Sequence, residues 1–128
     1  ANKGIDIAGY VNDVRPEILR GAVFLAPTRV GSGIRIKILE AMALGRPVVS
    51  TTVGAEGIEA VDGRDLQIAD TPDELVRAIA ALLQDHNARE KMGAAGLDLV
   101  RRHYGWDALG DQLAQTYAEV VETKRANA

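Results

Sequence analysis

The central part of the sequence is an apolar run that leads through a glycine loop into an amphipathic helix. The run at 22–27 is continuously apolar, as strands covered on both faces of a sheet are. Two glycines flank a serine at 31–33, and apolar residues recur at helical spacing from Ile34. Gly45 ends that pattern, and a second apolar run follows at 47–51. The stretch therefore predicts a strand, a helix and a second strand joined by short turns.

The segments on either side repeat this alternation. Ile5–Val11 has the composition of a short strand, and polar residues with Pro16 then mark a helix start. The segment 65–70 is a less apolar fourth strand. Strands that alternate with helices and are joined by short turns indicate an α/β fold with a parallel sheet of about four strands. Sequence patterns do not give the order of these strands.

From residue 71 onward the sequence is helical throughout. Thr71–Glu74 is a capping box with proline at the first helical position, and Asn87–Glu90 repeats the cap pattern for a second helix. A last helix begins at Trp106 and carries one apolar face, which we assign by default to a core or a domain interface. No linker divides the chain. We therefore expect one domain, with alternating strands and helices over 1–70 and a helical tail over 71–126.

Composition excludes several classes of function. The chain has 128 residues, of which 47% are hydrophobic and 26% charged, as in ordinary globular proteins. Its net charge of −3 argues against a nucleic-acid partner, and the lack of cysteine excludes disulfides and thiolate catalysis. His86 and His103 are far apart and no acidic cluster has metal-ligand spacing, so we predict no metal site. No membrane span or signal peptide is evident, and we expect a cytoplasmic protein.

The glycine loop and the helix after it predict an anion site. Gly31 and Gly33 lie between a buried strand and a helix start, where unpaired backbone N–H groups and the helix dipole favour a phosphate. Glu40, two turns into the helix, is placed to accept hydrogen bonds from sugar hydroxyls. The loops at 51–57 and 9–12 follow other predicted strands, and they would meet this loop if the strands are parallel.

Four segments together carry a resemblance to a known family. They are GYV at 9–11, AVFLAP at 22–27, KILEAMALGRPVVST at 37–51 and GAEGI at 54–58. Together with the helical tail, they resemble the C-terminal, donor-binding half of retaining family 4 glycosyltransferases, which have the two-domain GT-B fold. The resemblance covers the chain from about Gly9 to Val121. It implies a partial Rossmann-like sheet and a site for a nucleotide-sugar.

The family's Glu-x7-Glu motif gives roles to residues of the loop and helix. Glu40 matches the second glutamate, which in the family holds the ribose hydroxyls, while Ser32 stands where the first glutamate would contact the donor sugar. Loop positions Gly33, Ile34 and Arg35 match residues whose backbone faces the sugar and diphosphate. Lys37 is similar to a lysine of a bacterial subgroup. The predicted donor-binding residues are therefore Gly31, Ser32, Gly33, Ile34, Arg35, Lys37 and Glu40. No catalytic residue is assigned.

Simpler interpretations stay open at each position. Glu40 can be a solvated residue paired with Lys37 one turn back, and Ser32 can be a plain helix N-cap. Arg35 and Lys37 either face phosphate or are solvated. Thr52 and Gly54 belong first to a turn and second to a wall of the cleft.

The resemblance also implies what this chain does and lacks. We expect it to bind a nucleotide-sugar donor without metal or other cofactor, and to belong to an enzyme that glycosylates a glycan or a lipid-linked sugar. The enzyme would be cytoplasmic or membrane-peripheral. Because the family's N-terminal acceptor domain has no counterpart here, we expect the chain alone to be inactive. An incomplete sheet also exposes an edge strand, which predicts self-association through that edge.

Three other functions compete with this one. A nucleotide-sugar epimerase or a sugar phosphorylase would share the fold, and fold alone does not separate them. A scaffold that has lost its donor site would account for Ser32. A signalling receiver domain would need an acidic cluster after the first strand and a lysine after a late strand, and neither is present.

Overall fold

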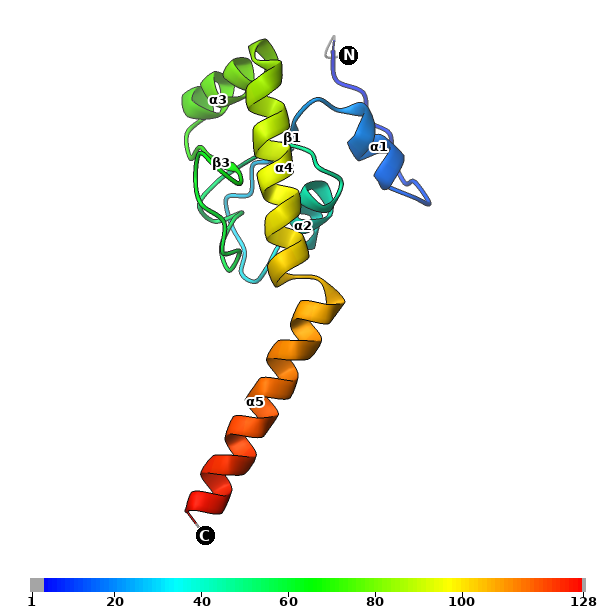
Figure 1. Cartoon of the computed structure of the whole chain (residues 1–128). Coiled ribbons are helices and arrows are strands. Elements are labelled where there is room, and N and C mark those ends of the chain that lie inside the picture. The colour runs from blue at the N-terminus through cyan, green and yellow to red at the C-terminus, as the bar shows by residue number, and fades with distance from the viewer. Residues whose placement is uncertain (1–3, 128) are drawn as a thin grey trace.

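A computed structural model describes residues 4–127, and Figure 1 shows a small α/β body from which one long helix projects. Residues 1–3 and 128, which belong to the predicted domain, lie outside the described residues. The elements in chain order are α1 (Arg15–Arg20), β1 (Phe24–Ala26), α2 (Ile36–Ala43), β2 (Val48–Ser50), β3 (Gln67–Ile68), α3 (Pro72–Gln84), α4 (His86–His103) and α5 (Trp106–Ala126). The α/β class is confirmed.

The sheet has three parallel strands in the order β1-β2-β3. All residues of β2 are buried, because this strand has neighbours on both sides. Ser50 is accommodated there because its Oγ donates to Ala26 O and to Thr51 O, each at 3.2 Å. The predictions for 22–27, 47–51 and 65–70 are confirmed, although each strand is shorter than its apolar run.

The prediction of a strand at Ile5–Val11, the first of the four along the chain, is wrong. The backbone there is irregular, and Ile7 and Tyr10 are 87% and 91% exposed. A strand is stable only when a neighbour pairs with its backbone groups, and no described strand lies beside this segment. Its strand-like composition is therefore not sufficient to form a strand.

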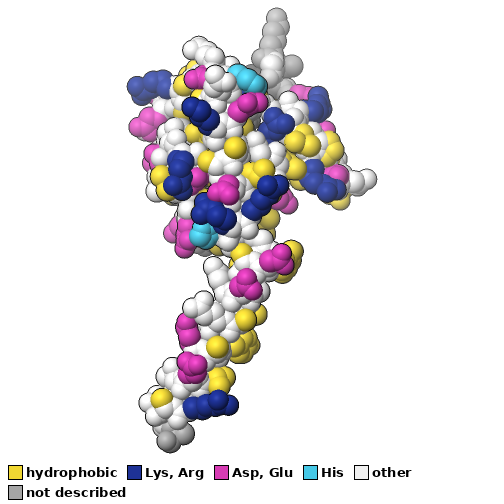
Figure 2. All heavy atoms as spheres, viewed as in Figure 1, with side chains coloured by type: hydrophobic (Ala, Val, Ile, Leu, Met, Phe, Trp, Pro, Cys, Tyr) yellow, Lys and Arg dark blue, Asp and Glu magenta, His cyan; other side chains and the backbone are white. Residues whose placement is uncertain are grey.

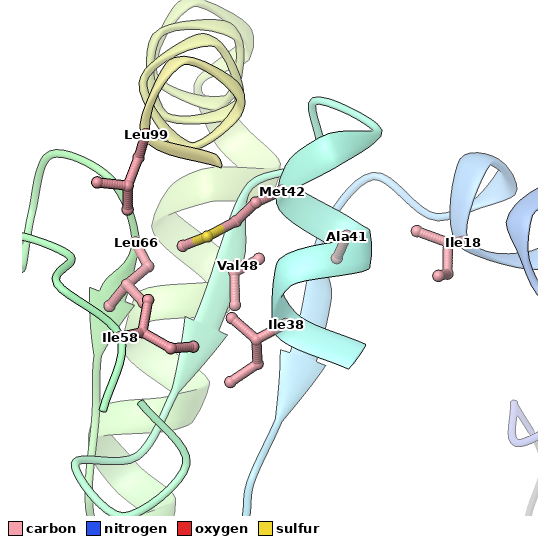
Figure 3. Close-up of a cluster of buried hydrophobic side chains, with 8 residues drawn as sticks. All are labelled: Ile18, Ile38, Ala41, Met42, Val48, Ile58, Leu66 and Leu99. Carbon is pink, nitrogen blue, oxygen red and sulfur yellow. The ribbon is translucent and has the colours of Figure 1, made fainter. Parts of the chain in front are cut away.

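Helix α2 covers one face of the sheet and supplies the centre of the core. Ile38, Ala41 and Met42 are fully buried on it, and Figure 3 shows them facing Val48, Leu66 and the other side chains of this cluster. The helix begins at Ile36 rather than at Ile34, which is 48% exposed. The reason lies in the backbone, because Gly33 has φ +84° and Arg35 is extended, so neither continues a helix toward the N-terminus.

Helix α3 packs on β2, and α4 contacts both α3 and α2. The capping box at Thr71 is confirmed, since Thr71 Oγ1 accepts from Glu74 N while the Glu74 carboxylate accepts from Thr71 N. The predicted cap at Asn87 is wrong, because Asp85 caps α4 by accepting from Ala88 N at 3.0 Å. Several polar residues lie at the junction of α3 and α4, and the sequence pattern alone does not indicate which of them caps α4.

Helix α4 lies close to α2 because it carries glycines at the contact. A Cβ on Gly93 would overlap the carbonyl oxygen of Gly45, and one on Gly96 would lie 3.1 Å from Asp65 O and 3.2 Å from Met42 Cγ. Gly93 and Gly96 are both buried. These two positions therefore fix how near the two helices can approach.

Helix α5 leaves the body at Gly105 and runs away from it (Figure 1). None of its residues is buried, and Trp106 is 91% exposed. Of the two assignments made for its apolar face, the core is therefore wrong, whereas the domain interface stays a prediction. Within 4–127 no helix, α5 included, combines the length and the apolar character required to cross a bilayer.

Candidate functional site

The loops that follow the three strands meet at the carboxyl edge of the sheet. Thr51, buried after β2, donates its Oγ1 proton to the carbonyl oxygen of Thr28 in the loop after β1. Thr52 donates from its N and from its Oγ1 to the two carboxylate oxygens of Asp70, both at 2.7 Å. The loops after β1, β2 and β3 are thus tied together, as parallel strands require.

The predicted third contributor, the turn at 9–12, does not follow a strand. No hydrogen bond between this turn and the other loops occurs in the described part of the chain. The convergence is therefore confirmed for the loops after β1 and β2, and the turn at 9–12 is not part of it.

Asp70 is a residue of this edge that the sequence interpretation missed. The N–H and hydroxyl of Thr52 both donate to its carboxylate and lower its pKa below the ordinary value. Its own N–H donates to Glu74 Oε2 at 2.9 Å. The sequence feature that could have identified Asp70 is its position between β3 and the capping box at Thr71. Asp70 therefore joins the end of the sheet to the start of α3.

The loop between β1 and α2 is shaped by Arg35. Its guanidinium folds back under the loop, where Nη1 donates to Ser32 O at 3.1 Å. Gly31 has φ +138°, and a Cβ there would overlap Arg35 Nη2. Gly31 is consequently favoured by its backbone angle, and a side chain there would displace the flexible end of Arg35. Arg35 rather than Ser32 is the N-cap residue of α2, so the N-cap interpretation of Ser32 does not hold.

Two donors of the same guanidinium have no partner. Arg35 Nε and Nη2 are buried and make no hydrogen bond among residues 4–127. A buried donor left unsatisfied costs about 1–3 kcal/mol, and more when the group is charged. A rearrangement that brought an anion to this guanidinium would recover that energy.

A pocket of about 610 Å³ lies between β1 and the start of α2. Its walls are mainly apolar, and Arg35 and Lys37 are its two cationic residues. Its lining residues are Phe24, Leu25, Ala26, Pro27, Thr28, Val30, Ile34, Arg35, Ile36, Lys37 and Ile38. A mostly apolar cavity with a few convergent charges is the usual form of a small-molecule site.

The structure brings together only some of the predicted residues. Ile34, Arg35 and Lys37 line this pocket, whereas the loop at 31–33 and Glu40 do not. Glu40 is exposed on α2, and no ion pair links it to Lys37 anywhere in 4–127. Its carboxylate is therefore available to a ligand that extends along the helix.

Thr52 and Gly54 occupy different environments. Thr52 is exposed and engaged with Asp70. Gly54 is buried, and a Cβ on it would overlap Ser50 Oγ and lie 3.1 Å from Ala26 O. Gly54 thus permits the loop after β2 to pack on the sheet. Neither residue lines the smaller cavity, of about 360 Å³, that Thr28, Arg29 and Asp70 border at this edge.

No metal site is apparent. Groups of three or more His, Asp or Glu side chains in metal-binding reach do not occur within the described residues. His86 and His103 each face a glutamate, with His86 Nε2 lying 3.2 Å from Glu90 and His103 Nδ1 lying 3.9 Å from Glu59.

Comparison with known families gives one match. Residues 1–85 match the family described as "Glycosyl transferases group 1". Among curated relatives, the chain is 34% identical over 121 residues to the phosphatidyl-myo-inositol mannosyltransferase of Mycobacterium leprae, which covers 91% of this chain and 32% of the relative. It is 29% identical over 125 residues to the D-inositol 3-phosphate glycosyltransferase of Corynebacterium efficiens, which covers 92% of this chain and 29% of that protein. The chain spans about a third of the length of these relatives.

Two solved structures share the fold. Sucrose-phosphate synthase from Thermosynechococcus elongatus superposes with a TM-score of 0.71 at 22% identity, over 86% of this chain and 28% of that one. The C-terminal domain of a group 1 glycosyl transferase from Francisella tularensis superposes with a TM-score of 0.67 at 23% identity, over 80% of this chain and 53% of that one.

Proposed function

The chain belongs to the group 1 glycosyl transferases, and from this premise we propose that it forms the nucleotide-binding side of a donor site for an NDP-sugar. The reaction would transfer a glycosyl group to an acceptor, a glycan or a lipid-linked sugar, with the nucleoside diphosphate as leaving group. The observation that carries the proposal is the pocket between β1 and α2, which is lined by Arg35, a residue with two unsatisfied buried donors.

The cations of this pocket suit a diphosphate. Arg35 and Lys37 lie at the start of α2, where the helix dipole adds positive potential. Negative charge develops on the diphosphate as the bond to the sugar breaks, and fixed cations stabilise that charge. We propose that the Arg35 guanidinium turns from Ser32 O toward the phosphate when the donor binds.

Glu40 would hold the ribose. Its exposed carboxylate lies one turn beyond Lys37, and without an ion-pair partner in the described residues it is free to accept two hydroxyl protons. Ser32 offers a hydroxyl where the family pattern has a glutamate, so the sugar itself would be held by fewer charge-assisted hydrogen bonds.

The test is calorimetric titration of the 128-residue chain with GDP, UDP and ADP, each compared with its nucleoside. GDP is the first probe, because the name of one Mycobacterium tuberculosis relative, 36% identical over 90 residues, specifies GDP-mannose. We expect Arg35→Ala to remove most of the advantage of the diphosphate over the nucleoside. Loss of a hydrogen bond to a charged group is worth about 1.5–3 kcal/mol, or roughly a 10- to 100-fold weaker affinity.

A second comparison isolates Glu40. The wild-type chain should prefer GDP over its 2′,3′-dideoxy analogue, and Glu40→Gln should lose that preference while Glu122→Gln, an exposed change on α5, keeps it. If none of the three diphosphates binds to a chain that unfolds cooperatively, the donor-site proposal fails and a non-catalytic scaffold is favoured.

A further inference from the structure

Tyr104 joins the end of α4 to the loop that follows β2. It is the C-cap residue of α4, and α5 leaves the body at the next residue, Gly105. Figure 2 shows the surface narrowing at this junction, from the body to the single projecting helix. Tyr104 Oη accepts a hydrogen bond from Glu59 N at 3.1 Å and donates a longer, weaker one to Gly57 O at 3.5 Å. One side chain at the junction thus holds both ends of the segment 57–59.

The ring and the hydroxyl of Tyr104 make separate contacts. The ring is half-buried and packs against the core cluster that contains Ile38 and Ile58. Tyr104→Phe keeps this packing and removes the hydroxyl alone. Because Glu59 is exposed, water can replace the acceptor that its N–H would lose. The hydroxyl therefore contributes mainly to the position of the segment 57–59 and little to the stability of the body.

The segment 57–59 lies against a residue of the pocket between β1 and α2. Gly57 has φ +79°, and a Cβ built on it would lie 3.1 Å from Ile34 Cγ1. The Gly57 backbone and the Ile34 side chain are therefore neighbours. Ile34 lines the pocket and directly precedes Arg35, whereas Tyr104 does not line it. A path of contacts thus runs from Tyr104 through Gly57 and Ile34 to the pocket.

We propose that Tyr104 is a positioning residue for the donor site, an inference that rests on the proposed function. Its hydroxyl keeps the segment 57–59 against Ile34, and Ile34 in turn keeps the loop before α2 in the form that presents Arg35 to the diphosphate. A contact that is held in place before binding spares the entropy of ordering it during binding. Loss of the hydroxyl should therefore weaken the binding of the donor.

The first test is calorimetric titration with whichever of GDP, UDP and ADP binds the wild-type chain most tightly. Tyr104→Phe should weaken that binding roughly 2- to 12-fold, which is the usual worth of one neutral hydrogen bond. Tyr117→Phe is the matched control, because it removes the same hydroxyl from an exposed position on α5. Asp85→Ala removes the N-cap at the other end of α4, so it should lower the melting temperature and leave the affinity unchanged.

A double-mutant cycle tests whether Tyr104 acts through Ile34. The affinity for the same diphosphate is measured for Tyr104→Phe, for Ile34→Ala and for the double variant. Residues that act through one another give non-additive effects, whereas independent losses add. We therefore expect Tyr104→Phe to weaken binding much less in the Ile34→Ala chain than in the wild-type chain.

A measurement without ligand separates this inference from the proposed function. The δ1 methyl group of Ile34 is isotopically labelled, and its NMR signal is assigned by its disappearance in Ile34→Val. Tyr104→Phe should shift this signal, because the segment 57–59 moves relative to Ile34. Tyr117→Phe should leave it in place.

Three results would overturn the inference while the proposed function stands. They are a Tyr104→Phe chain that binds the diphosphate as tightly as Tyr117→Phe does, additive effects in the cycle, and an Ile34 methyl signal that Tyr104→Phe does not shift. A wild-type chain that binds none of the three diphosphates refutes the donor site itself, and the role of Tyr104 in binding with it.

Discussion

Asp65 is a buried carboxylate whose hydrogen bonds make stability depend on pH. It is 2% exposed and accepts from Val61 N at 2.8 Å and from Arg64 Nε and Nη2 at 2.9 Å. The bonds from Arg64 hold the pKa of Asp65 below its ordinary value of 3.8. Because the folded state favours the ionised form, this stabilisation is complete above the ordinary pKa and is lost as the pH falls through the lowered one.

We predict that Asp65→Asn lowers the free energy of unfolding at neutral pH by about 1–3 kcal/mol. The gap to the wild-type chain should shrink as the pH falls below about 4, where the wild-type carboxylate is itself protonated. Urea unfolding at neutral and acidic pH measures both quantities, with the exposed Asp6→Asn as control. An equal gap at both pH values would mean that the carboxylate charge plays no part.

Residues of the loop between β1 and α2 show how far sequence reasoning reaches at this scale. The two glycines at 31–33 were identified as turn residues, and positive φ angles confirm that. The sequence did not reveal that the Arg35 side chain folds beneath these glycines. A contact between a side chain and its own loop produces no periodic pattern in the sequence. Asp70 was missed for a similar reason, since its partner Thr52 is 18 positions away.

At the level of elements, the close packing of α4 against α2 predicts that a larger residue at Gly93 destabilises the fold. Gly93→Ala would force a methyl group against the backbone of Gly45, which cannot give way as a flexible side chain can. Overpacking of this kind costs about 1–3 kcal/mol, which exceeds the gain of up to about 1 kcal/mol in helix propensity. We therefore expect a melting temperature lower by several degrees, read by circular dichroism.

Gly110→Ala is the matched control on α5. A Cβ at Gly110 meets nothing within 4 Å, so the same substitution should raise helicity by its propensity alone. If Gly93→Ala is as stable as the wild-type chain, a methyl group fits at the contact between α2 and α4 and the prediction is wrong.

Elements were predicted well where the determinants are local and poorly where they are not. The capping box at Thr71 lies within four residues, and it was identified from sequence. The strand at Ile5–Val11 required a neighbour that no described segment supplies. The apolar face of α5 was recognised, but a pattern shows that a face is apolar and not what covers it.

For the whole molecule, one prediction concerns turnover by the 128-residue chain alone. The chain spans 32% of the mycobacterial mannosyltransferase, and no nucleophile or general base has been assigned in its pocket. We predict that it hydrolyses or transfers no nucleotide-sugar above the level of a Glu40→Ala control. Release of free nucleotide from NDP-sugars, followed by chromatography, measures this. Turnover by the wild-type chain alone would refute the prediction.

The order of the strands has a kinetic consequence. Phe24 pairs with Val48 and Val49 with Gln67, so each strand lies beside the next one along the chain. The entropy lost in closing a loop rises with the logarithm of its length, and here each closure spans a single connection, 27–47 or 51–66. Sheets of this kind have low contact order for parallel strands, and low contact order shortens the search for the native state. The loop between β1 and α2 thus belongs to the first closure along the sequence, the one that pairs β1 with β2.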